Sequence, residues 1–328
     1  MKSLRNENDL VRRIAKRFER SASGTLRLGL DDDTALWQPR PGYETVLTCD
    51  WFLEDSHFIR DKHPADAVGW KCLARAVSDI AAMGGEPRCF LLSLALPMEL
   101  AGKWFEGFLR GLRRASTALR CELAGGDTTR EERVLISIAV IGEVKRGRAI
   151  LRSGAKPDDL LFVTGTLGEA ALGLSLLKDS MSEDRKARGT LRRHLYPEPK
   201  IQLGQLLGSK GLATAMIDVS DGLSSDVARL CEASGVGAVI ARNALPRPKG
   251  IPEAEAVRLA LHGGDDYELL FTVRPNQIRR FKKSLRRFGD LPVSLIGGIT
   301  KDTALRLVND EGMTEELSPS GWDPFRNK

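Results

Sequence analysis

Residues 160–177 read LLFVTGTLGEAALGLSLL, and this stretch decides the class of fold. Leu160–Thr164 is a short apolar run of the kind that forms a buried strand. Gly165–Gly168 then turns the chain into Glu169–Leu177, where apolar residues recur at helical spacing. A strand that passes directly into a helix is the building unit of α/β proteins. The turn also leaves open a phosphate site at the helix N-terminus.

The alternation of strands and helices continues on both sides of this stretch. Upstream, the spacing of apolar residues predicts helices over 8–19, 66–83 and 100–119 and strands over 89–96 and 133–142. Downstream, it predicts helices over 201–207, 222–234 and 253–261 and strands over 213–219 and 267–273. The charged segment 178–193 is predicted to be a loop. The pattern as a whole predicts an α/β (α+β) protein.

The length of 328 residues exceeds what one hydrophobic core usually holds, so we predict two domains. Residues 148–159, rich in Gly, Pro and Lys, form the predicted passage between them. The predicted domains are therefore residues 1–147 and residues 148–328. Each contains a Gly-Gly-Asp turn, at 125–127 and at 263–265, which hints that the two domains are related.

Composition narrows the class of protein and its compartment. The net charge is +6, but the densest basic cluster, within 279–287, recurs at helical spacing and indicates a solvated helix face rather than a nucleic-acid groove. Five dispersed cysteines without a CxxC pair favour free thiols and a cytoplasmic location. No apolar run approaches the 18 or so residues of a membrane span. We therefore expect neither a nucleic-acid nor a membrane partner.

The aspartates stand in unusual places. Asp50, Asp127 and Asp218 each follow an apolar run and are expected to end a buried strand, where a lone carboxylate is costly without a cation. Asp79 lies in the middle of an apolar helix, where it neither caps nor turns the chain. Further acids are Asp32, Asp33 and Asp221. Carboxylates that converge on one cleft would bind Mg²⁺.

Each acid except Asp79 also has an ordinary structural interpretation. The run 31–33 and the acids after Gly-Gly are compatible with simple turns. Either Ser220 or Asp221 fits the N-cap of the helix that begins at Gly222. The chain has no P-loop, no GxGxxG after its first strand and no protein-kinase catalytic loop. These absences exclude the common nucleotide-binding motifs, and a Mg²⁺ site built from aspartates remains the prediction from the residues.

Eight motifs, in order and spanning roughly residues 10 to 325, resemble those of the thiamine-monophosphate kinase family. They are LGLDDDTAL (28–36), TCDWFLEDSHF (48–58), SDIAAMGGEP (78–87), GGDTTR (125–130), RSGAKPD (152–158), IDVSDGLS (217–224), GGDDYELLF (263–271) and GWDPF (321–325). The resemblance implies a two-domain fold shared with aminoimidazole ribonucleotide synthetase, with mixed sheets flanked by helices. It also implies a homodimer whose N-terminal domain binds metal and ATP and forms the dimer.

The activity implied by the resemblance is the ATP-dependent phosphorylation of thiamine monophosphate to thiamine diphosphate with Mg²⁺. The implied metal ligands are Asp32, Thr48, Cys49, Asp50, Asp79, Asp127, Asp218 and Asp221, with a backbone carbonyl as the donor for at least one of Thr48 and Cys49. Gly126, Asp127, Arg152 and Ser220 are implied to contact ATP. His57, Asp265 and Trp322 are implied to contact the substrate. Asp50, Asp127 and Arg152 are the expected catalytic residues.

Three positions depart from the family pattern. Asp31 replaces the second glycine of GxGDD, and the usual GGED reads Gly-Gly-Asp265-Asp266. The tyrosine usual in the helix before Gly-Gly-Asp is missing, and Leu109 is a candidate for its place.

The acceptor of the expected reaction is a phosphate oxygen that is already anionic, so no general base is needed and direct in-line transfer is favoured. Metal ions would position the two anions and neutralise their charge. Two alternatives remain: a related ATP-dependent synthetase of the aminoimidazole ribonucleotide synthetase type, and a non-catalytic protein that binds Mg-nucleotide.

Overall fold

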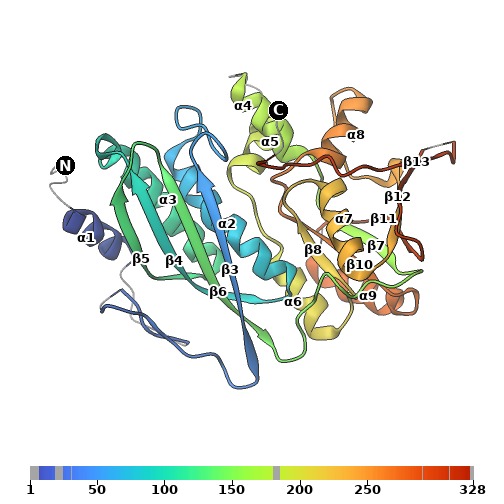
Figure 1. Cartoon of the computed structure of the whole chain (residues 1–328), viewed down its shortest axis with the longest axis horizontal. Coiled ribbons are helices and arrows are strands. Elements are labelled where there is room, and N and C mark those ends of the chain that lie inside the picture. Colours follow the sequence, from blue (N-terminus) through green and yellow to red (C-terminus); the bar gives the residue numbers. More distant parts are fainter. Residues whose placement is uncertain are drawn as a thin grey trace. The chain divides into compact units, whose positions relative to one another are not determined.

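The computed structural model describes residues 7–18, 25–30, 32–179, 185–289, 291–309 and 311–325. The chain divides into two compact units, which are coloured along the sequence in Figure 1. Unit 1 comprises Met1–Ile80 and Glu86–Arg146, and unit 2 comprises Ala81–Gly85 and Gly147–Lys328.

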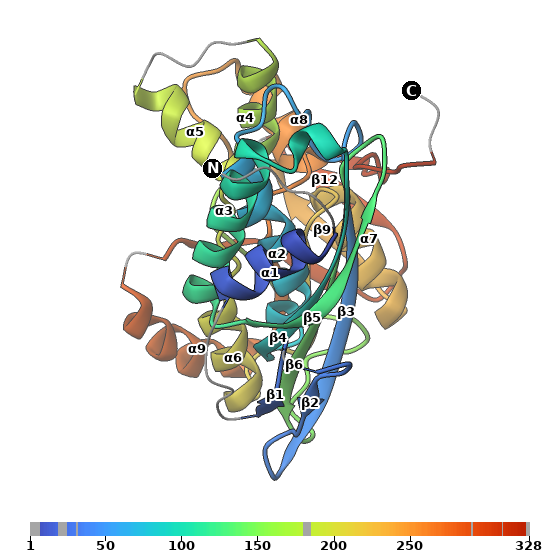
Figure 2. The same ribbon diagram turned by 90° about the vertical axis from the view of Figure 1, so that its left-hand side faces the viewer.

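Unit 1 is a mixed sheet with helices on one face (Figure 2). Its helices are α1 (Glu7–Phe18), α2 (Ala65–Ala82) and α3 (Lys103–Leu119), with a 3-10 turn η1 (Met98–Leu100). Its strands are β1 (Leu26–Leu28), β2 (Leu36–Trp37), β3 (Tyr43–Leu53), β4 (Glu86–Leu96), β5 (Glu122–Arg130) and β6 (Leu135–Lys145). The main sheet has the order β3-β6-β4-β5, and β1 pairs with β2 separately. Only β4 and β5 are parallel within the main sheet.

The two faces of the main sheet differ in burial. Residues paired directly across a ladder point to the same face, so the register assigns each side chain to one face. One row of paired residues lies on the face covered by helices, where Ile138 and Leu92 are almost fully buried. It consists of Asp50, Ile138, Leu92 and Gly126. The next row lies on the open face and consists of Trp51, Ser137, Ser93 and Asp127.

Unit 2 is a seven-stranded mixed sheet with helices on both faces. Its helices are α4 (Glu169–Lys178), α5 (Arg185–Leu195), α6 (Ile201–Lys210), α7 (Leu223–Ser234), α8 (Glu253–His262) and α9 (Ile278–Leu285), with 3-10 turns η2 (Arg242–Ala244), η3 (Pro275–Gln277) and η4 (Arg286–Phe288). Its strands are β7 (Leu160–Thr164), β8 (Met216–Val219), β9 (Gly237–Ala241), β10 (Glu268–Val273), β11 (Val293–Thr300), β12 (Leu305–Val308) and β13 (Thr314–Glu316). The strand order is β13-β12-β9-β11-β7-β10-β8.

Strand β7 shows how the sheet of unit 2 builds two cores. Leu161 and Val163 belong to the core on the face of α7 and α8, whereas Phe162 belongs to the core on the face of α6 and α9. Phe162 packs against Phe271 and Phe281 with ring centroids 5.8 and 5.0 Å apart. This alternation is expected for a strand buried on both faces, and it agrees with the predicted strand–turn–helix at 160–177.

One predicted element is wrong. The segment 178–193 was predicted to be a loop because of its charges, but its residues from Arg185 onward belong to α5, which continues to Leu195. Leu191, His194 and Leu195 are buried and share one helix face at spacings of three and four; the charged residues between them hid this short apolar face. The basic cluster of 279–287 lies on the exposed side of α9 and η4, as predicted, while Phe281 packs inward. Among the described residues, none of the helices is both long enough and apolar enough to cross a membrane.

Candidate functional site

The edge strand β3 and the helix α2 bring three predicted ligands to one face of unit 1. The hydroxyl of Thr48 donates a hydrogen bond to Asp79 Oδ2 at 2.5 Å. Asp50, two residues along the strand and on the same face, lies 3.9 Å from Arg75 Nε, one turn before Asp79 on α2. Cys49 points to the open face, where its Sγ lies 3.4 Å from Ser137 Oγ. Thr48, Asp50 and Asp79 thus form a polar cluster at the sheet edge.

Asp127 lies on the other edge strand, β5, and on the open face of the sheet. It is paired with Ser93, is exposed, and accepts a hydrogen bond from the backbone N–H of Thr128 at 2.9 Å. The expectation that Asp50 and Asp127 end their strands is wrong, because β3 continues to Leu53 and β5 to Arg130. Both strands keep pairing with a neighbour beyond the end of the apolar run.

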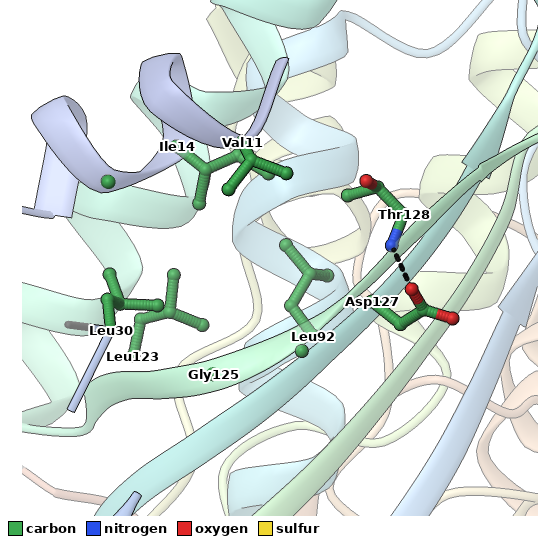
Figure 3. A pocket seen from close by; sticks show the side chains of 10 residues that line it. Val11, Ile14, Leu30, Leu92, Leu123, Gly125, Asp127 and Thr128 are labelled. Carbon is green, nitrogen blue, oxygen red and sulfur yellow. Dashed lines mark hydrogen bonds between the residues drawn. The ribbon is translucent and has the colours of Figure 1, made fainter. Parts of the chain in front are cut away.

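Gly126 precedes Asp127 in a conformation that only glycine adopts readily. Its φ is 155°, and a Cβ built on it would lie 1.9 Å from the carbonyl oxygen of Leu92. Figure 3 shows a pocket beside this position, with a volume of about 120 Å³, between α1 and the edge of β5. Its lining is mostly apolar, and Asp127 lies at its border with the carboxylate directed away from Val11 and Ile14.

Two further predicted residues of unit 1, His57 and Asp32, occupy loops. The backbone N–H of Leu53 donates to His57 Nδ1 at 3.0 Å, so the ring closes the turn that follows β3 and, when neutral, has its proton on Nε2. Asp32 is exposed and accepts a hydrogen bond from the N–H of Asp33. Asp31 lies outside the described residues. Leu109 is fully buried in α3 and is therefore not placed to contact a nucleotide base.

In unit 2, the end of β8 carries Asp218, and the loop between β8 and α7 carries Ser220 and Asp221. Asp218 is buried near the end of β8, one residue before the strand ends at Val219. Neither Ser220 nor Asp221 caps α7, which begins after Gly222 without a side-chain cap. Instead, Asp226 Oδ2 accepts hydrogen bonds from the N–H groups of Ser220, Asp221 and Gly222 at 3.0, 3.1 and 3.1 Å.

Asp226 and Arg229 were not among the predicted site residues. Arg229 Nη1 lies 2.7 Å from Asp226 Oδ1 and 2.6 Å from Asp221 Oδ2. Burial raises the pKa of Asp226 to about 6, reinforced by the Asp221 charge and opposed by Arg229 and the backbone hydrogen bond from Asp221. The sequence signal for both was an acid in the first turn of a predicted helix with arginine three residues later.

The loop after α8 and the C-terminal tail join the same part of unit 2. The backbone N–H of Asp265 donates to the Ser220 carbonyl, and that of Trp322 donates to the Asp221 carbonyl, each at 2.8 Å. Tyr267 donates its hydroxyl to Asp265 Oδ1 at 2.7 Å, and His194 Nδ1 of α5 lies 3.8 Å from Asp265 Oδ2. Both Asp265 and Tyr267 have positive φ, 71° and 51°, in this tight turn.

Serine side chains hold the tail in place. Ser225 Oγ accepts from the N–H of Gly321 at 3.0 Å, and Ser224 Oγ accepts from the N–H of Ser320 at 3.2 Å. Ser224 also lies 2.9 Å from His262 Nδ1, and burial, followed by the nearby Arg258 charge, lowers the pKa of His262. The structure thus brings Ser220, Asp221, Asp265 and Trp322 together around one loop.

Two further features predicted for unit 2 are the phosphate site at the N-terminus of α4 and the position of Arg152. The N-terminus of α4 is not open to a phosphate, because Asp266 accepts hydrogen bonds there from the N–H groups of Gly168 at 2.6 Å and Ala170 at 3.2 Å. The carbonyl of Arg152 accepts from Ser234 Oγ at 2.7 Å, at the end of α7 opposite Gly222. The 12 residues of α7 span about 18 Å, so the backbone of Arg152 is remote from the Asp221 loop.

The predicted ligands offer mainly carboxylate oxygens, which Mg²⁺ prefers, but they do not form a complete coordination shell by themselves. In the described ranges, no three Asp, Glu, His or Cys residues are close enough together to hold a metal ion. The acids instead occur singly or two at a time: Asp50 and Asp79 belong to the polar cluster of unit 1, and Asp218 and Asp221 lie three residues apart at the end of β8 and in the loop after it. Proteins usually bind Mg²⁺ through one or two carboxylates together with water and substrate phosphates. The observed sets fit that mode of binding.

Comparison with known proteins places the chain in a family. The family model "AIR synthase related protein, N-terminal domain" matches residues 31–144, and the corresponding C-terminal domain model matches 156–309. Thiamine-monophosphate kinase of Salmonella typhimurium is 37% identical over 95% of this chain and 97% of its own length.

Solved structures give the same result. The crystal structure of thiamine-monophosphate kinase from Stenotrophomonas maltophilia superposes with a TM-score of 0.81 at 34% identity, over 95% of this chain and 98% of that one. The structure of AaThiL complexed with AMPPCP and TMP has a TM-score of 0.76 at 32% identity, over 99% and 100%. The predicted two-domain fold with mixed sheets is confirmed. The chain therefore belongs to the thiamine-monophosphate kinases, within the AIR synthase related proteins.

Proposed function

We propose that this chain transfers the terminal phosphoryl group of ATP to thiamine monophosphate, which yields thiamine diphosphate and ADP. The observation that carries the proposal is the assembly of Ser220, Asp221, Asp265 and Trp322 around one loop of unit 2. An acidic and aromatic site suits the flat, cationic thiazolium ring of the substrate, which an indole can stack against. Family membership over nearly the whole chain supports the same activity.

The acids would act through Mg²⁺, which neutralises the phosphates when it is bound. We propose that Thr48, Asp50 and Asp79 hold a metal ion from the edge of unit 1, with Asp127 on the open face. Asp218 and Asp221 are the proposed metal ligands of unit 2. Cys49 and Asp32 are the remaining members of the proposed ligand set. Because the acceptor oxygen is already anionic, these residues need only orient the two phosphates for in-line transfer.

The proposed nucleotide contacts are Gly126, Asp127, Ser220 and Arg152. The apolar pocket beside Gly126 is the proposed place of the adenine base, because Gly126 and Asp127 border it. The exposed guanidinium of Arg152 can offset phosphate charge. We propose that His57, Asp265 and Trp322 contact the acceptor substrate.

The purified chain is expected to form thiamine diphosphate and ADP in equal amounts from ATP and thiamine monophosphate with Mg²⁺. Excess EDTA should abolish both products, and added Mg²⁺ should restore them, because the carboxylates alone would repel the phosphates. Chromatography of the thiamine phosphates and a coupled ADP assay measure the two products.

The same assay separates the two alternatives. A synthetase of the aminoimidazole ribonucleotide synthetase type would release ADP only with an amide-containing substrate. A non-catalytic Mg-nucleotide-binding protein would bind ATP without releasing ADP. Both alternatives therefore predict no ADP release when thiamine monophosphate is the second substrate, and that result would contradict the proposed function.

We also propose a homodimer formed through the open face of the sheet of unit 1. Leu47, Trp51 and Leu91 project from this face and are 72%, 56% and 39% exposed. Apolar side chains that gather on one exposed face mark an interaction surface. We propose that residues 1–147 form the N-terminal domain that binds metal and ATP and forms the dimer. Residues 148–328 form the C-terminal α/β domain, which carries the further proposed contacts Arg152, Asp218, Ser220 and Asp221.

Trp51→Glu is expected to convert the dimer into a monomer, because it places a charge in an apolar interface. Analytical ultracentrifugation should give the mass of two 36.0-kDa chains for the parent protein and of one for the variant. Met313→Glu, which alters a methionine of unit 2 that is 59% exposed, is the control and should remain dimeric. A monomeric parent protein, or a dimeric Trp51→Glu variant, would contradict this interface.

A cytoplasmic location remains a proposal. It is supported by the five free cysteines, of which Cys72, Cys89, Cys121 and Cys231 are buried.

A further inference from the structure

The backbone N–H groups of the loop Ser220–Gly222 form an anion-binding nest, and a carboxylate of the same chain occupies it. Three consecutive backbone N–H groups converge on a single oxygen, Asp226 Oδ2, at 3.0 to 3.1 Å. Successive N–H groups in this arrangement commonly bind phosphate. Here the bound anion is the fully buried carboxylate of Asp226, from the first turn of α7. This loop therefore does not offer its backbone N–H groups to ATP and can act only through its side chains and carbonyls.

Arg229 connects this buried anion to Asp221. A single nitrogen, Nη1, lies 2.7 Å from Asp226 Oδ1 and 2.6 Å from Asp221 Oδ2. Arg229 is three residues after Asp226 on α7, so the helix fixes its base. The Asp221 carboxylate is thereby held in one orientation by a group that is itself anchored to a buried carboxylate. Such outer partners set the direction of a ligating carboxylate.

The loop also supports residues from two distant segments. The Ser220 carbonyl accepts from the N–H of Asp265, and the Asp221 carbonyl accepts from the N–H of Trp322. A shift of this loop would therefore move the proposed metal ligand and both proposed substrate contacts of unit 2 together. Its conformation depends on the contacts made by Asp226.

We propose that Asp226 and Arg229 are positioning residues: Asp226 fixes the loop that carries Ser220 and Asp221, and Arg229 orients the Asp221 carboxylate toward a divalent cation. This inference rests on the proposed function, in which Asp221 is a metal ligand. It assigns the two residues different tasks, so the corresponding variants should behave differently.

Arg229→Gln is expected to raise the Mg²⁺ concentration for half-maximal activity about 10- to 100-fold, the usual effect of losing an outer partner of a ligand. At saturating Mg²⁺, kcat should return to within about threefold of the parent value, since Arg229 contacts no reacting atom. Binding of Mn²⁺ in the presence of a non-hydrolysable ATP analogue, followed by electron paramagnetic resonance, should weaken by the same factor. Arg229→Lys, which keeps the charge, should have a Mg²⁺ requirement between those of the parent protein and Arg229→Gln.

Asp226→Asn should also weaken the protection of the loop amides against hydrogen exchange, which Arg229→Gln should leave unchanged. Amide hydrogen exchange at 220–222 is expected to become at least about tenfold faster, because a neutral amide accepts the three N–H groups less strongly. Arg306→Gln is the matched control, since it removes a 3.0 Å ion pair with Asp302 in the same unit. It should leave metal dependence and exchange unchanged.

An unchanged Mg²⁺ dependence in Arg229→Gln would overturn the proposal. So would a loss of kcat that persists at saturating Mg²⁺ with normal Mn²⁺ binding, because this would place Arg229 in the chemistry itself. If Asp226→Asn does not fold, Arg229→Gln alone decides. A parent protein without thiamine-phosphate kinase activity would instead refute the proposed function, so the two failures are distinguishable.

Discussion

Asp127→Asn is expected to lower kcat about 10²- to 10³-fold while leaving the fold intact. This is the usual scale of losing one preorganised electrostatic partner of the transition state. Asp127 is exposed, and the hydrogen bond that it accepts from the N–H of Thr128 can be kept by the asparagine amide oxygen. The free energy of unfolding should therefore change by less than about 0.5 kcal/mol. Steady-state kinetics and thermal unfolding measure the two effects.

Asp61→Asn is the matched control, because Asp61 is an exposed acid of the same unit outside the proposed site. It should keep the parent kcat. Asp50→Asn, on the opposite face of the sheet, is expected to lose turnover as Asp127→Asn does. Full activity in either of these two variants would remove that residue from the proposed metal set.

Gly126→Ala is expected to destabilise unit 1 by about 2–4 kcal/mol, since it combines an unfavourable φ with a steric clash. The added Cβ would lie 1.9 Å from the oxygen of Leu92 and 2.7 Å from its carbonyl carbon. These are backbone atoms of the paired strand β4, so the clash can be relieved only by separating β4 from β5. Asp127 and the border of the apolar pocket would move with β5. Calorimetry and the affinity for ATP measure the two consequences.

The neighbouring glycine provides the control for this prediction. A Cβ on Gly125 would lie 3.4 Å from the side chain of Leu91, which is an ordinary contact. Gly125→Ala should therefore cost less than about 1 kcal/mol. Similar unfolding temperatures for the two variants would show that the β4–β5 pairing tolerates a side chain at Gly126.

Local patterns predicted the elements better than they predicted where those elements end. Asp79 was predicted to lie within a helix, and it does, although in the last turn of α2 and not in its middle. Asp50 and Asp127 were expected at strand ends, because their apolar runs stop there. Pairing with a neighbouring strand continues past those points, and a single sequence does not contain that information. Charges likewise hid α5, whose buried face is only three residues wide.

The sequence by itself determined the class of fold, the family and most of the acids that we propose as ligands, because apolar periodicity and short motifs are local properties of the chain. Only the tertiary structure decided which of those acids share a face, that the N–H groups of Ser220–Gly222 are already bound by Asp226, and that Trp322 is held beside Asp221. These contacts join segments up to about 100 residues apart. They depend on strand register and chain packing, which the order of residues does not display.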